Sequence, residues 1–342
     1  MNIYFGEDAF AHLSVMTNNY DKFFLLTDEN IFRIYSSMIA SLFPEKKIEK
    51  IVLPAGEDAK NIDNVMLNWN KLLEYKAGRD SLLVNLGGGT ISDIGGFAAS
   101  CYKRGIDFVN IPTTLLAMVD ASIGGKNGIN FYNYKNQIGL FSEPESIIIN
   151  PYFLKTLDER DILSGLAEMI KYAFIADSSF LNLDRDNYLE FIEKSATIKD
   201  DIVGLDMNET GLRKILNFGH TIGHALESFY LEKDNYLTHG ETVALGIYSA
   251  LHLSMKYCGL DEKWLFVYEM WSKANLNTFN LDGFDVETIM SYISHDKKNK
   301  GGKPQFVLIS APEKPQIDVE VDENDIKESI LILKEKFSVN VN

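Results

Sequence analysis

Three of the six histidines in this 342-residue chain fall within residues 217–241. His220 and His224 are four positions apart, so on a helix they share one face. His239 stands at the expected opening of the next helix. Imidazole nitrogen is the commonest protein ligand for metal ions. The cluster therefore favours a metal site over a set of ordinary hydrogen-bonded helix histidines.

A carboxylate that could complete such a site lies earlier in the chain. Glu168 and Lys171 are three positions apart in an apolar segment with helical spacing, so they share a face. One glutamate with two histidines is a catalytic zinc arrangement that leaves a coordination position open for substrate. The spacing leaves open whether His220 or His224 would be a ligand.

A second candidate site is the glycine-rich turn at Gly87–Gly89, which follows an apolar strand and opens an apolar helix. Glycines let the backbone approach a phosphate, and the free N–H groups of the helix favour an anion. Ser92 stands where the dinucleotide fingerprint has its third glycine, so a plain tight turn is the alternative. Thr113 and Thr114 open another helix, where they could cap it or also hold a ligand.

The pattern around these sites predicts two domains. Apolar runs at residues 23–27, 48–53, 81–86, 108–111 and 146–149, with a helix at 61–75, indicate a parallel sheet covered on both faces. No proline occurs between Pro151 and Pro304, and segments 160–176, 212–229 and 242–257 have helical spacing. We therefore expect a Rossmann-like α/β domain at 1–150 and a mostly α-helical domain at 151–342.

Composition limits the possible partners. A net charge of −16 excludes the clustered basic surface needed for nucleic acid or an anionic membrane. The two cysteines, Cys101 and Cys258, match no metal or redox spacing, which favours a reducing compartment. The N-terminus has no signal-peptide pattern and there is no apolar run of membrane-spanning length. A cytoplasmic location is expected.

Several segments together resemble the 3-dehydroquinate synthase family, the second enzyme of the shikimate pathway. They occur in the family's order over residues 56–310, most of the chain: GGGTISDIGGF, YKRG, IPTTLLAMVDASIGGKNGIN, YKNQIG, SGLAEMIKY, NETGLRKILNFGHTIGHALE, HGETVALG and DKKNKGGK.

The resemblance implies a homodimeric lyase with NAD bound to the N-terminal domain and a divalent metal, zinc or else cobalt, in the C-terminal domain. Its active site would lie in the cleft between the domains. Its substrate would be 3-deoxy-D-arabino-heptulosonate 7-phosphate, converted to 3-dehydroquinate and phosphate. A hydroxyl is transiently oxidised, phosphate leaves, the carbonyl is reduced, and the opened ring closes by an intramolecular aldol step. NAD is not consumed.

The same resemblance implies a role for individual residues. The metal ligands would be Glu168, His220 and His239, which resolves the choice between the histidines. NAD contacts would be Asp28, Asn30, Glu57, Lys60, Gly88, Gly89, Asp93, Thr113, Thr114, Lys126, Lys135, Thr156, Leu157 and Asp161. Substrate contacts would be Asp120, Lys126, Lys135, Asn136, Lys171, Lys199, Glu209, Arg213, Asn217, His224 and one of Lys297 and Lys298, with Arg104 supplied by the neighbouring subunit.

The chain departs from the family pattern at three places: Asn127 stands where threonine is usual, Asp161 where glutamate is usual, and Phe131–Tyr134 replaces the usual loop. None of these departures removes a charged substrate contact.

Lysine and arginine suit a phosphate and a carboxylate, since they stabilise the charge that develops as phosphate leaves. Glu209 and Arg213 would also be an i, i+4 pair if the helix starts that early, in which case Glu209 orients Arg213.

Three other functions remain possible from the sequence. One is another sugar phosphate cyclase, of the valiolone or deoxy-inosose type, with the same cofactors but different substrate-facing residues. The second is a metal-dependent polyol dehydrogenase, which would not need cations for a leaving phosphate. The third is a non-catalytic NAD- or metal-binding protein, which would be expected to have lost a ligand or a lysine. The preferred hypothesis is a small positive pocket for one anionic sugar in an acidic protein.

Overall fold

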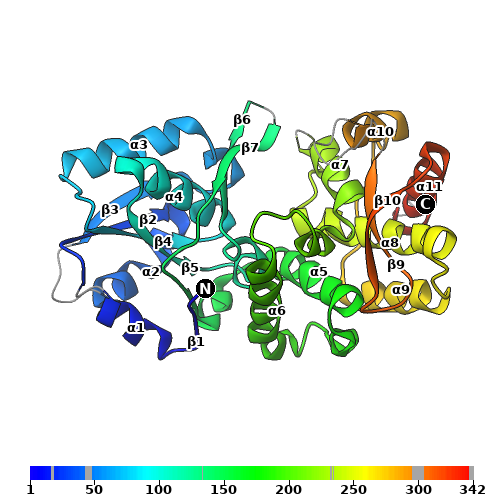
Figure 1. The fold of residues 1–342 in the computed structure, drawn as a ribbon, viewed down its shortest axis with the longest axis horizontal. Coiled ribbons are helices and arrows are strands. Elements are labelled where there is room, and N and C mark those ends of the chain that lie inside the picture. Colours follow the sequence, from blue (N-terminus) through cyan, green and yellow to red (C-terminus); the bar gives the residue numbers. More distant parts are fainter. Residues whose placement is uncertain are drawn as a thin grey trace. The chain divides into compact units, whose positions relative to one another are not determined.

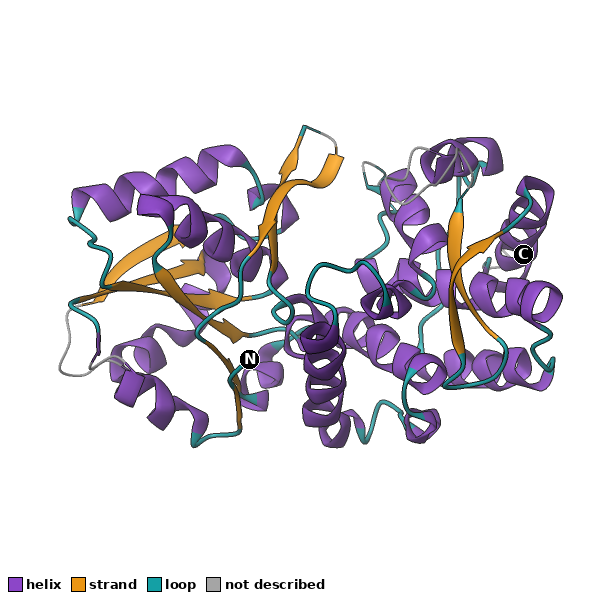
Figure 2. Ribbon diagram, in the orientation of Figure 1, coloured by secondary structure: helices purple, strands orange, loops and turns teal. Residues whose placement is uncertain are grey.

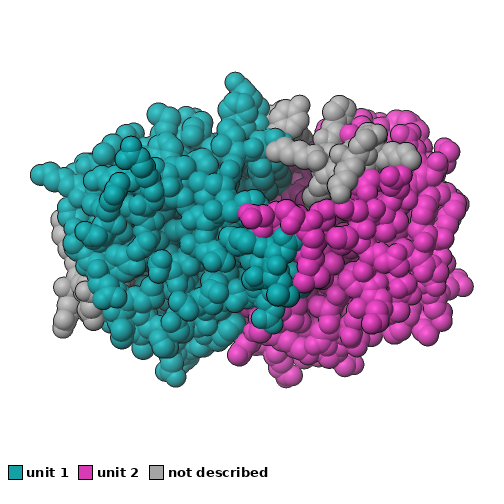
Figure 3. Space-filling model, in the orientation of Figure 1, with its two compact units in different colours: residues 1–158, 199–207 teal, residues 159–198, 208–342 magenta. Residues whose placement is uncertain are grey.

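The computed structural model describes residues 1–16, 19–42, 48–132, 134–231, 233, 235–294 and 304–338. The chain forms two compact units, coloured in Figure 3. Unit 1 is Met1–Asp158 with Lys199–Met207, and unit 2 is Glu159–Ile198 with Asn208–Asn342. The sequence predicted a single boundary near Pro151. In the structure the chain returns to unit 1 at residues 199–207, which was not predicted. As a division between NAD-binding and metal-binding functions, that boundary stays a prediction.

Unit 1 is built on a six-stranded sheet in which every pairing is parallel. Its order is β1-β8-β5-β4-β2-β3. The strands are β1 (Ile3–Phe5), β2 (Lys22–Asp28), β3 (Ile48–Leu53), β4 (Ser81–Gly87), β5 (Asp107–Pro112) and β8 (Ser146–Ile149). The α/β prediction and its five strands are confirmed. β1 was not predicted, since a three-residue strand carries too little periodicity.

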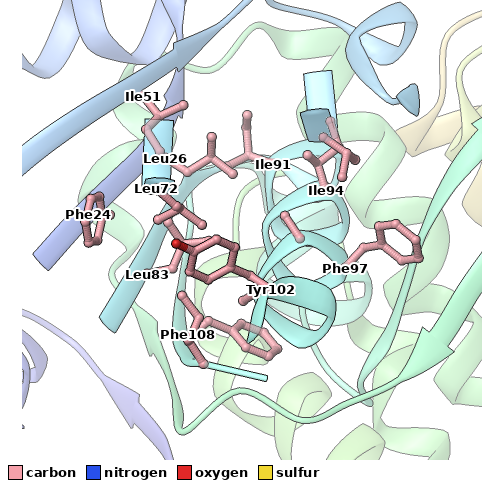
Figure 4. Packing of buried hydrophobic residues seen from close by; sticks show 14 of the residues in the cluster. Phe24, Leu26, Ile51, Leu72, Leu83, Ile91, Ile94, Phe97, Tyr102 and Phe108 are labelled. Carbon is pink, nitrogen blue, oxygen red and sulfur yellow. The ribbon is translucent and has the colours of Figure 1, made fainter. Parts of the chain in front are cut away.

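Helices cover both faces of this sheet, as its continuous apolar strands require. Figure 1 shows α1 (Ala9–Met16) and α2 (Glu29–Leu42) on one face, and α3 (Ile62–Glu74) and α4 (Gly89–Cys101) on the other. Figure 4 shows the core under α3 and α4, where Leu26, Leu83 and Ile94 are completely buried. Each such side chain contributes about 1.5–3 kcal/mol by leaving water.

The register of the sheet places three of the predicted NAD residues, Asp28, Gly88 and Thr113, at one edge. Thr27 pairs with Leu86 and Gly87 pairs with Pro112, so the carboxyl ends of β2, β4 and β5 lie together. The connection from β2 leads outward to β3, whereas that from β4 leads the other way to β5. Open α/β sheets bind ligands at such a reversal. The topology therefore favours a ligand at this edge.

Shorter elements complete unit 1. Strands β6 (Lys126–Phe131) and β7 (Tyr134–Phe141) form an antiparallel hairpin that was not predicted. The short helices of unit 1 are η2 (Glu57–Ala59), η3 (Tyr102–Arg104), the π-helical η4 (Ala117–Ala121) and η5 (Pro151–Thr156).

Unit 2 is mostly helical, as predicted, and Figure 2 shows its one pair of strands among the described residues. Its helices are α5 (Glu159–Ile175), the first half of α6 (Ile192–Leu205), α7 (His220–Tyr230), α8 (His239–Cys258), α9 (Lys263–Asn275), α10 (Val286–Ser294) and α11 (Glu323–Phe337). Shorter turns are η6 (Ser178–Asn182), η7 (Tyr188–Phe191) and η8 (Leu212–Asn217), and the strands are β9 (Gln305–Ile309) and β10 (Pro315–Glu320). Across the described residues, no helix combines the length and apolar character needed to span a bilayer.

The predicted helix at 212–229 is broken in the structure. Residues 212–217 form the 3₁₀ turn η8, and α7 begins only at His220. The break lies at Gly219, whose φ of 80° is left-handed and therefore suits glycine.

Helix α8 packs backbone to backbone against its neighbours through two glycines. A Cβ at Gly240 would lie 2.1 Å from the carbonyl oxygen of Ser164 on α5. A Cβ at Gly246 would lie 1.9 Å from the carbonyl oxygen of Gly219, just before α7. Any side chain at either position would push the helices apart.

We expect Gly246→Ala to destabilise the protein by about 3 kcal/mol or more, because the overlap is with backbone and no rotamer relieves it. Chemical denaturation followed by circular dichroism measures the loss. Gly204→Ala, in α6 with nothing within 4 Å of its Cβ, is the control. It should leave stability unchanged or raise it by about 1 kcal/mol. Equal stability of the two variants would contradict the packing argument.

Candidate active site

The glutamate and two of the histidines meet in unit 2. Glu168 lies on α5, and His220 and His239 are the first residues of α7 and α8. Oε1 of Glu168 is 3.2 Å from Nε2 of His220 and 3.2 Å from Nε2 of His239. Three helices thus bring one carboxylate oxygen and two imidazole nitrogens to one point.

His224 belongs to the same cluster. Its ring lies 5.1 Å from that of His220 and 5.8 Å from that of His239, measured between centroids. The ligand-capable atoms of the three histidines lie within 4.8 Å of one another. The described contacts therefore allow a ligand set with Glu168 or with His224, and the choice made from the resemblance stays a prediction.

The cluster carries a buried negative charge. Glu168 is 0% exposed and Lys171, whose Nζ is 2.5 Å from its Oε2, is 1% exposed. Burial raises the pKa of Glu168, but Lys171 and His220 outweigh burial and hold that pKa well below its ordinary value. An anionic carboxylate beside imidazole nitrogens fits a divalent cation of the zinc type.

The pKa values of the two histidines beside Glu168 shift in opposite directions. Burial lowers the pKa of His220, against the opposing effect of Glu168. Burial also favours neutral His239, but Glu227 and Glu168 outweigh it and raise the pKa of His239 to about 10. Because a bound metal replaces this proton, metal binding at His239 would release one.

Three further predicted substrate residues lie just before α7. Arg213 is 2% exposed, and Nδ2 of Asn217 donates to Oε1 of Glu209 at 2.6 Å. The condition for an i, i+4 pairing of Glu209 with Arg213, an early helix start, is not met, and the orientation of Arg213 by Glu209 stays a prediction. Glu209 has a left-handed φ of 56° and the 3₁₀ turn starts only at Leu212, so the two are not one helical turn apart.

The glycine-rich turn in unit 1 has the form expected for a phosphate site. Gly88 caps α4, and a Cβ there would lie 3.1 Å from Cγ2 of Thr114. Thr114 Oγ1 accepts from the Ala117 N–H at 3.2 Å, which confirms the predicted cap. The buried hydroxyl of Thr113 has no hydrogen-bond partner among the described residues. A bare backbone cradle, a helix N-terminus and an unsatisfied hydroxyl fit the phosphates of a dinucleotide.

Helix α4 presents an ion pair one turn further on. Lys60 is buried and its Nζ contacts Oδ2 of Asp93. Burial raises the pKa of Asp93, and Lys60 moderates that effect. The predicted NAD contacts Lys60 and Asp93 thus lie side by side and form an ion pair.

Other predicted NAD contacts are engaged elsewhere. Oδ1 of Asp28 accepts from the N–H groups of Asn30 and Ile31 at 2.9 and 3.0 Å, so it caps α2. The hydroxyl of Thr156 lies 2.6 Å from that of Tyr35. Leu157 is half-buried in unit 1, whereas Asp161 is exposed in the first turn of α5 in unit 2.

The remaining predicted substrate residues of the described chain lie in unit 1. Lys199 donates to both the backbone oxygen and Oδ1 of Asp120 at 2.7 Å. Lys126, Lys135 and Asn136 lie on the β6–β7 hairpin, and Arg104 is exposed in a left-handed turn with a φ of 68°. Lys297 and Lys298 fall outside the described residues.

Two residues that the sequence did not single out connect these elements. Thr90 Oγ1 donates to Oε2 of Glu57 at 2.9 Å, and Asn130 Nδ2 donates to Oε1 at 3.0 Å. Oδ1 of Asn130 accepts from the N–H of Asn136 at 3.0 Å. Asn136 has a left-handed φ of 53°, which asparagine adopts more readily than most residues, and this bond restrains its backbone there. The two residues were missed because their shared partner, Glu57, is distant in the sequence, 33 positions from Thr90 and 73 from Asn130.

We expect Asn130→Ala to accelerate hydrogen exchange at the Asn136 amide by about tenfold or more, because its acceptor is lost. Hydrogen–deuterium exchange of peptides covering residues 126–141 measures this. Thr90→Val is the control, since it removes a Glu57 contact without touching Asn136. If both variants exchange like the parent chain, the Asn130 link does not hold the hairpin.

Comparison with solved structures identifies the class of fold. The 2-deoxy-scyllo-inosose synthase complexed with carbaglucose-6-phosphate, NAD⁺ and Co²⁺ gives a TM-score of 0.86 at 24% identity, covering 96% of this chain and 95% of that one. ValA, a 2-epi-5-epi-valiolone synthase from Streptomyces hygroscopicus subsp. jinggangensis 5008 with NAD⁺ and Zn²⁺ bound, gives 0.85 at 23% identity, covering 98% and 97%. The chain therefore has the same fold as these two synthases.

Sequence comparison identifies the family. The family descriptions "3-dehydroquinate synthase N-terminal" and "3-dehydroquinate synthase C-terminal" match residues 50–164 and 165–299. The 3-dehydroquinate synthase of Parabacteroides distasonis is 40% identical over 329 residues, covering 94% of this chain and 93% of that protein. The chain belongs to the 3-dehydroquinate synthase family, whose members are carbon–oxygen lyases. The resemblance found in the motifs is confirmed.

Proposed function

We propose that this chain converts 3-deoxy-D-arabino-heptulosonate 7-phosphate to 3-dehydroquinate and phosphate, using NAD and one divalent metal. The observation that carries the proposal is the approach of Glu168 to His220 and His239, at 3.2 Å each, in a chain 40% identical to a 3-dehydroquinate synthase. Zinc is the first candidate for the metal and cobalt the second, because the two structural neighbours carry Zn²⁺ and Co²⁺.

When bound, NAD accepts and returns a hydride, and the metal draws charge from a hydroxyl oxygen and so favours loss of its proton. Glu168, His220 and His239 would hold the metal. The α4 N-terminus, with Gly88 and Thr113, would hold the phosphates of NAD.

In unit 2 the chain supplies cations and an amide for an anionic substrate. Lys171 and Arg213 are buried, so their charges are screened less by water than surface charges are. Glu209 accepts from the amide of Asn217 and so fixes how that side chain is presented. These groups would stabilise the charge that develops on the leaving phosphate.

In unit 1 Lys199 is held in place by Asp120 through two hydrogen bonds. A lysine fixed before binding loses less conformational freedom when an anion arrives. Lys126, Lys135 and Asn136 would contact the substrate from the hairpin. We propose that the two sets of residues serve one reaction.

The rival functions explain these features less well. A polyol dehydrogenase has no leaving phosphate, so it has no need for the buried Lys171, Lys199 and Arg213. Another sugar phosphate cyclase is disfavoured because the two cyclase structures are 23–24% identical to this chain, against 40% for the 3-dehydroquinate synthase.

The assembly and location are part of the proposal. Arg104 lies exposed in a turn where it and Lys103 both have left-handed φ angles, of 68° and 49°. Strained, exposed residues of this kind cluster at functional sites. The proposed assembly is a homodimer, as the family resemblance implies, in which the exposed Arg104 would complete the site of the neighbouring subunit. The proposed location is the cytoplasm.

We expect the purified chain to release phosphate from the heptulosonate phosphate and form dehydroquinate without net NADH, because NAD is regenerated in each turnover. Phosphate detection and absorbance at the NADH band measure this. A chelator should abolish the activity, and zinc or cobalt should restore it. NADH accumulating in step with turnover would instead indicate a dehydrogenase, and full activity after chelation would remove the metal from the proposal.

We expect Lys199→Ala to raise the KM for the heptulosonate phosphate by about tenfold or more, since it removes a buried cation and leaves Asp120 without it. The Kd for NAD, followed by fluorescence, should change little. Lys194→Ala, an exposed lysine on the same helix, is the control. An equal loss of affinity for substrate and NAD would mean that the substitution disturbs the fold.

A further inference from the structure

His239 lies between two carboxylates. Its Nε2 is 3.2 Å from Oε1 of Glu168, and its Nδ1 is 3.3 Å from Oε2 of Glu227. Glu227 is only 9% exposed and lies on α7. A buried glutamate needs a polar partner, and the ring of His239 provides one.

We propose that Glu227 is a positioning residue for His239 in the metal site. Its carboxylate accepts the hydrogen bond from Nδ1–H and so turns Nε2, with its free lone pair, toward the cation beside Glu168. Metal-ligating histidines commonly have their second nitrogen fixed in this way, which selects both the tautomer and the ring orientation. This inference rests on the metal of the proposed function.

The main chain at His239 is fixed by other groups. Thr238 and Glu241 form a reciprocal capping box at the start of α8. Arg160 binds both oxygens of Glu241, at 2.8 and 2.7 Å. Because the backbone is held without Glu227, the contact with Glu227 acts on the remaining freedom of His239, the rotation of its side chain.

Helix α7 presents its polar residues in a way that suits this role. Glu227 follows His220 by seven positions and His224 by three, so all three lie along one face. His220 itself is oriented differently, since its Nδ1 lies 3.1 Å from the backbone oxygen of Phe218. One predicted ligand is thus oriented by a neutral carbonyl and the other by a carboxylate.

The carboxylate also affects charge. A divalent cation at this point would have two glutamates near it, Glu168 directly and Glu227 through the His239 ring. A carboxylate on the far nitrogen increases the electron density of the ring and strengthens it as a ligand. Removing the charge alone should therefore weaken metal binding less than removing the whole acceptor does.

The experiment compares Glu227→Ala, Glu227→Gln and the parent chain by zinc affinity, measured against a competing chelator. We expect the alanine variant to bind zinc about 10–100-fold more weakly. The glutamine variant should lose less, because its amide oxygen still accepts from Nδ1–H. The visible spectrum of the cobalt-loaded alanine variant should shift as the ring reorients, and its Kd for NAD should not change.

Glu269→Gln is the matched control, since Glu269 contacts Tyr248 and Lys336 on other elements. It should bind zinc like the parent chain. If the alanine variant fails to fold by circular dichroism, the glutamine variant decides. Parent-like zinc affinity and cobalt spectra in the folded variants would overturn the role of Glu227. A parent chain that binds no zinc or cobalt would instead overturn the metal of the proposed function, and this inference with it.

Discussion

The candidate metal site of unit 2 depends on close packing of α8. At two glycines its backbone lies directly against the backbone of neighbouring segments. Gly240 lies against the backbone of Ser164, and Gly246 against that of Gly219. Each contact is close in sequence to a predicted ligand: Gly240 follows His239, Gly219 precedes His220, and Ser164 is one helical turn before Glu168. The distance between helices is set where their backbones touch. These glycines therefore let α5, α7 and α8 approach closely enough for Oε1 of Glu168 to contact both His220 and His239.

Unit 1 uses glycines on α4 in a different way, because they make room for side chains and not for a neighbouring backbone. A Cβ at Gly95 would lie 1.9 Å from Oδ1 of Asn85, and one at Gly96 would lie 1.9 Å from Oδ1 of Asn127. Asn127 is one of the three departures from the family pattern, and its amide donates to the backbone oxygens of Gly125 and Ser142. Gly96 on α4 therefore leaves room for the amide of Asn127.

What could be predicted from the sequence was local. The strands are continuous apolar runs, the glycine turn follows one of them, and the His220–His224 spacing is a helical repeat. The helix that would place Glu209 one turn before Arg213 does not form, because the chain is left-handed at Glu209 and non-helical at Gly211, which the spacing alone could not show. Asn130 and Glu227 were missed because their roles come from partners 73 and 12 positions away along the chain, Glu57 and His239. No local pattern marks such contacts. The sequence pattern also cannot choose between Glu168 and His224 as the third metal ligand, because both lie beside His220 and His239.

The net charge of −16 described the surface and not the site. In unit 1 the buried Lys60 and Lys199 pair with Asp93 and Asp120, and in unit 2 Lys171 pairs with Glu168. Each pair adds nothing to the net charge, so composition cannot reveal it. Holding a lysine out of water is costly unless a carboxylate compensates. Once so held, the cation meets an arriving anion without first losing its hydration shell. A negative net charge therefore does not exclude a buried site for one small anion, because such a site needs only a few cations that internal partners already hold out of water.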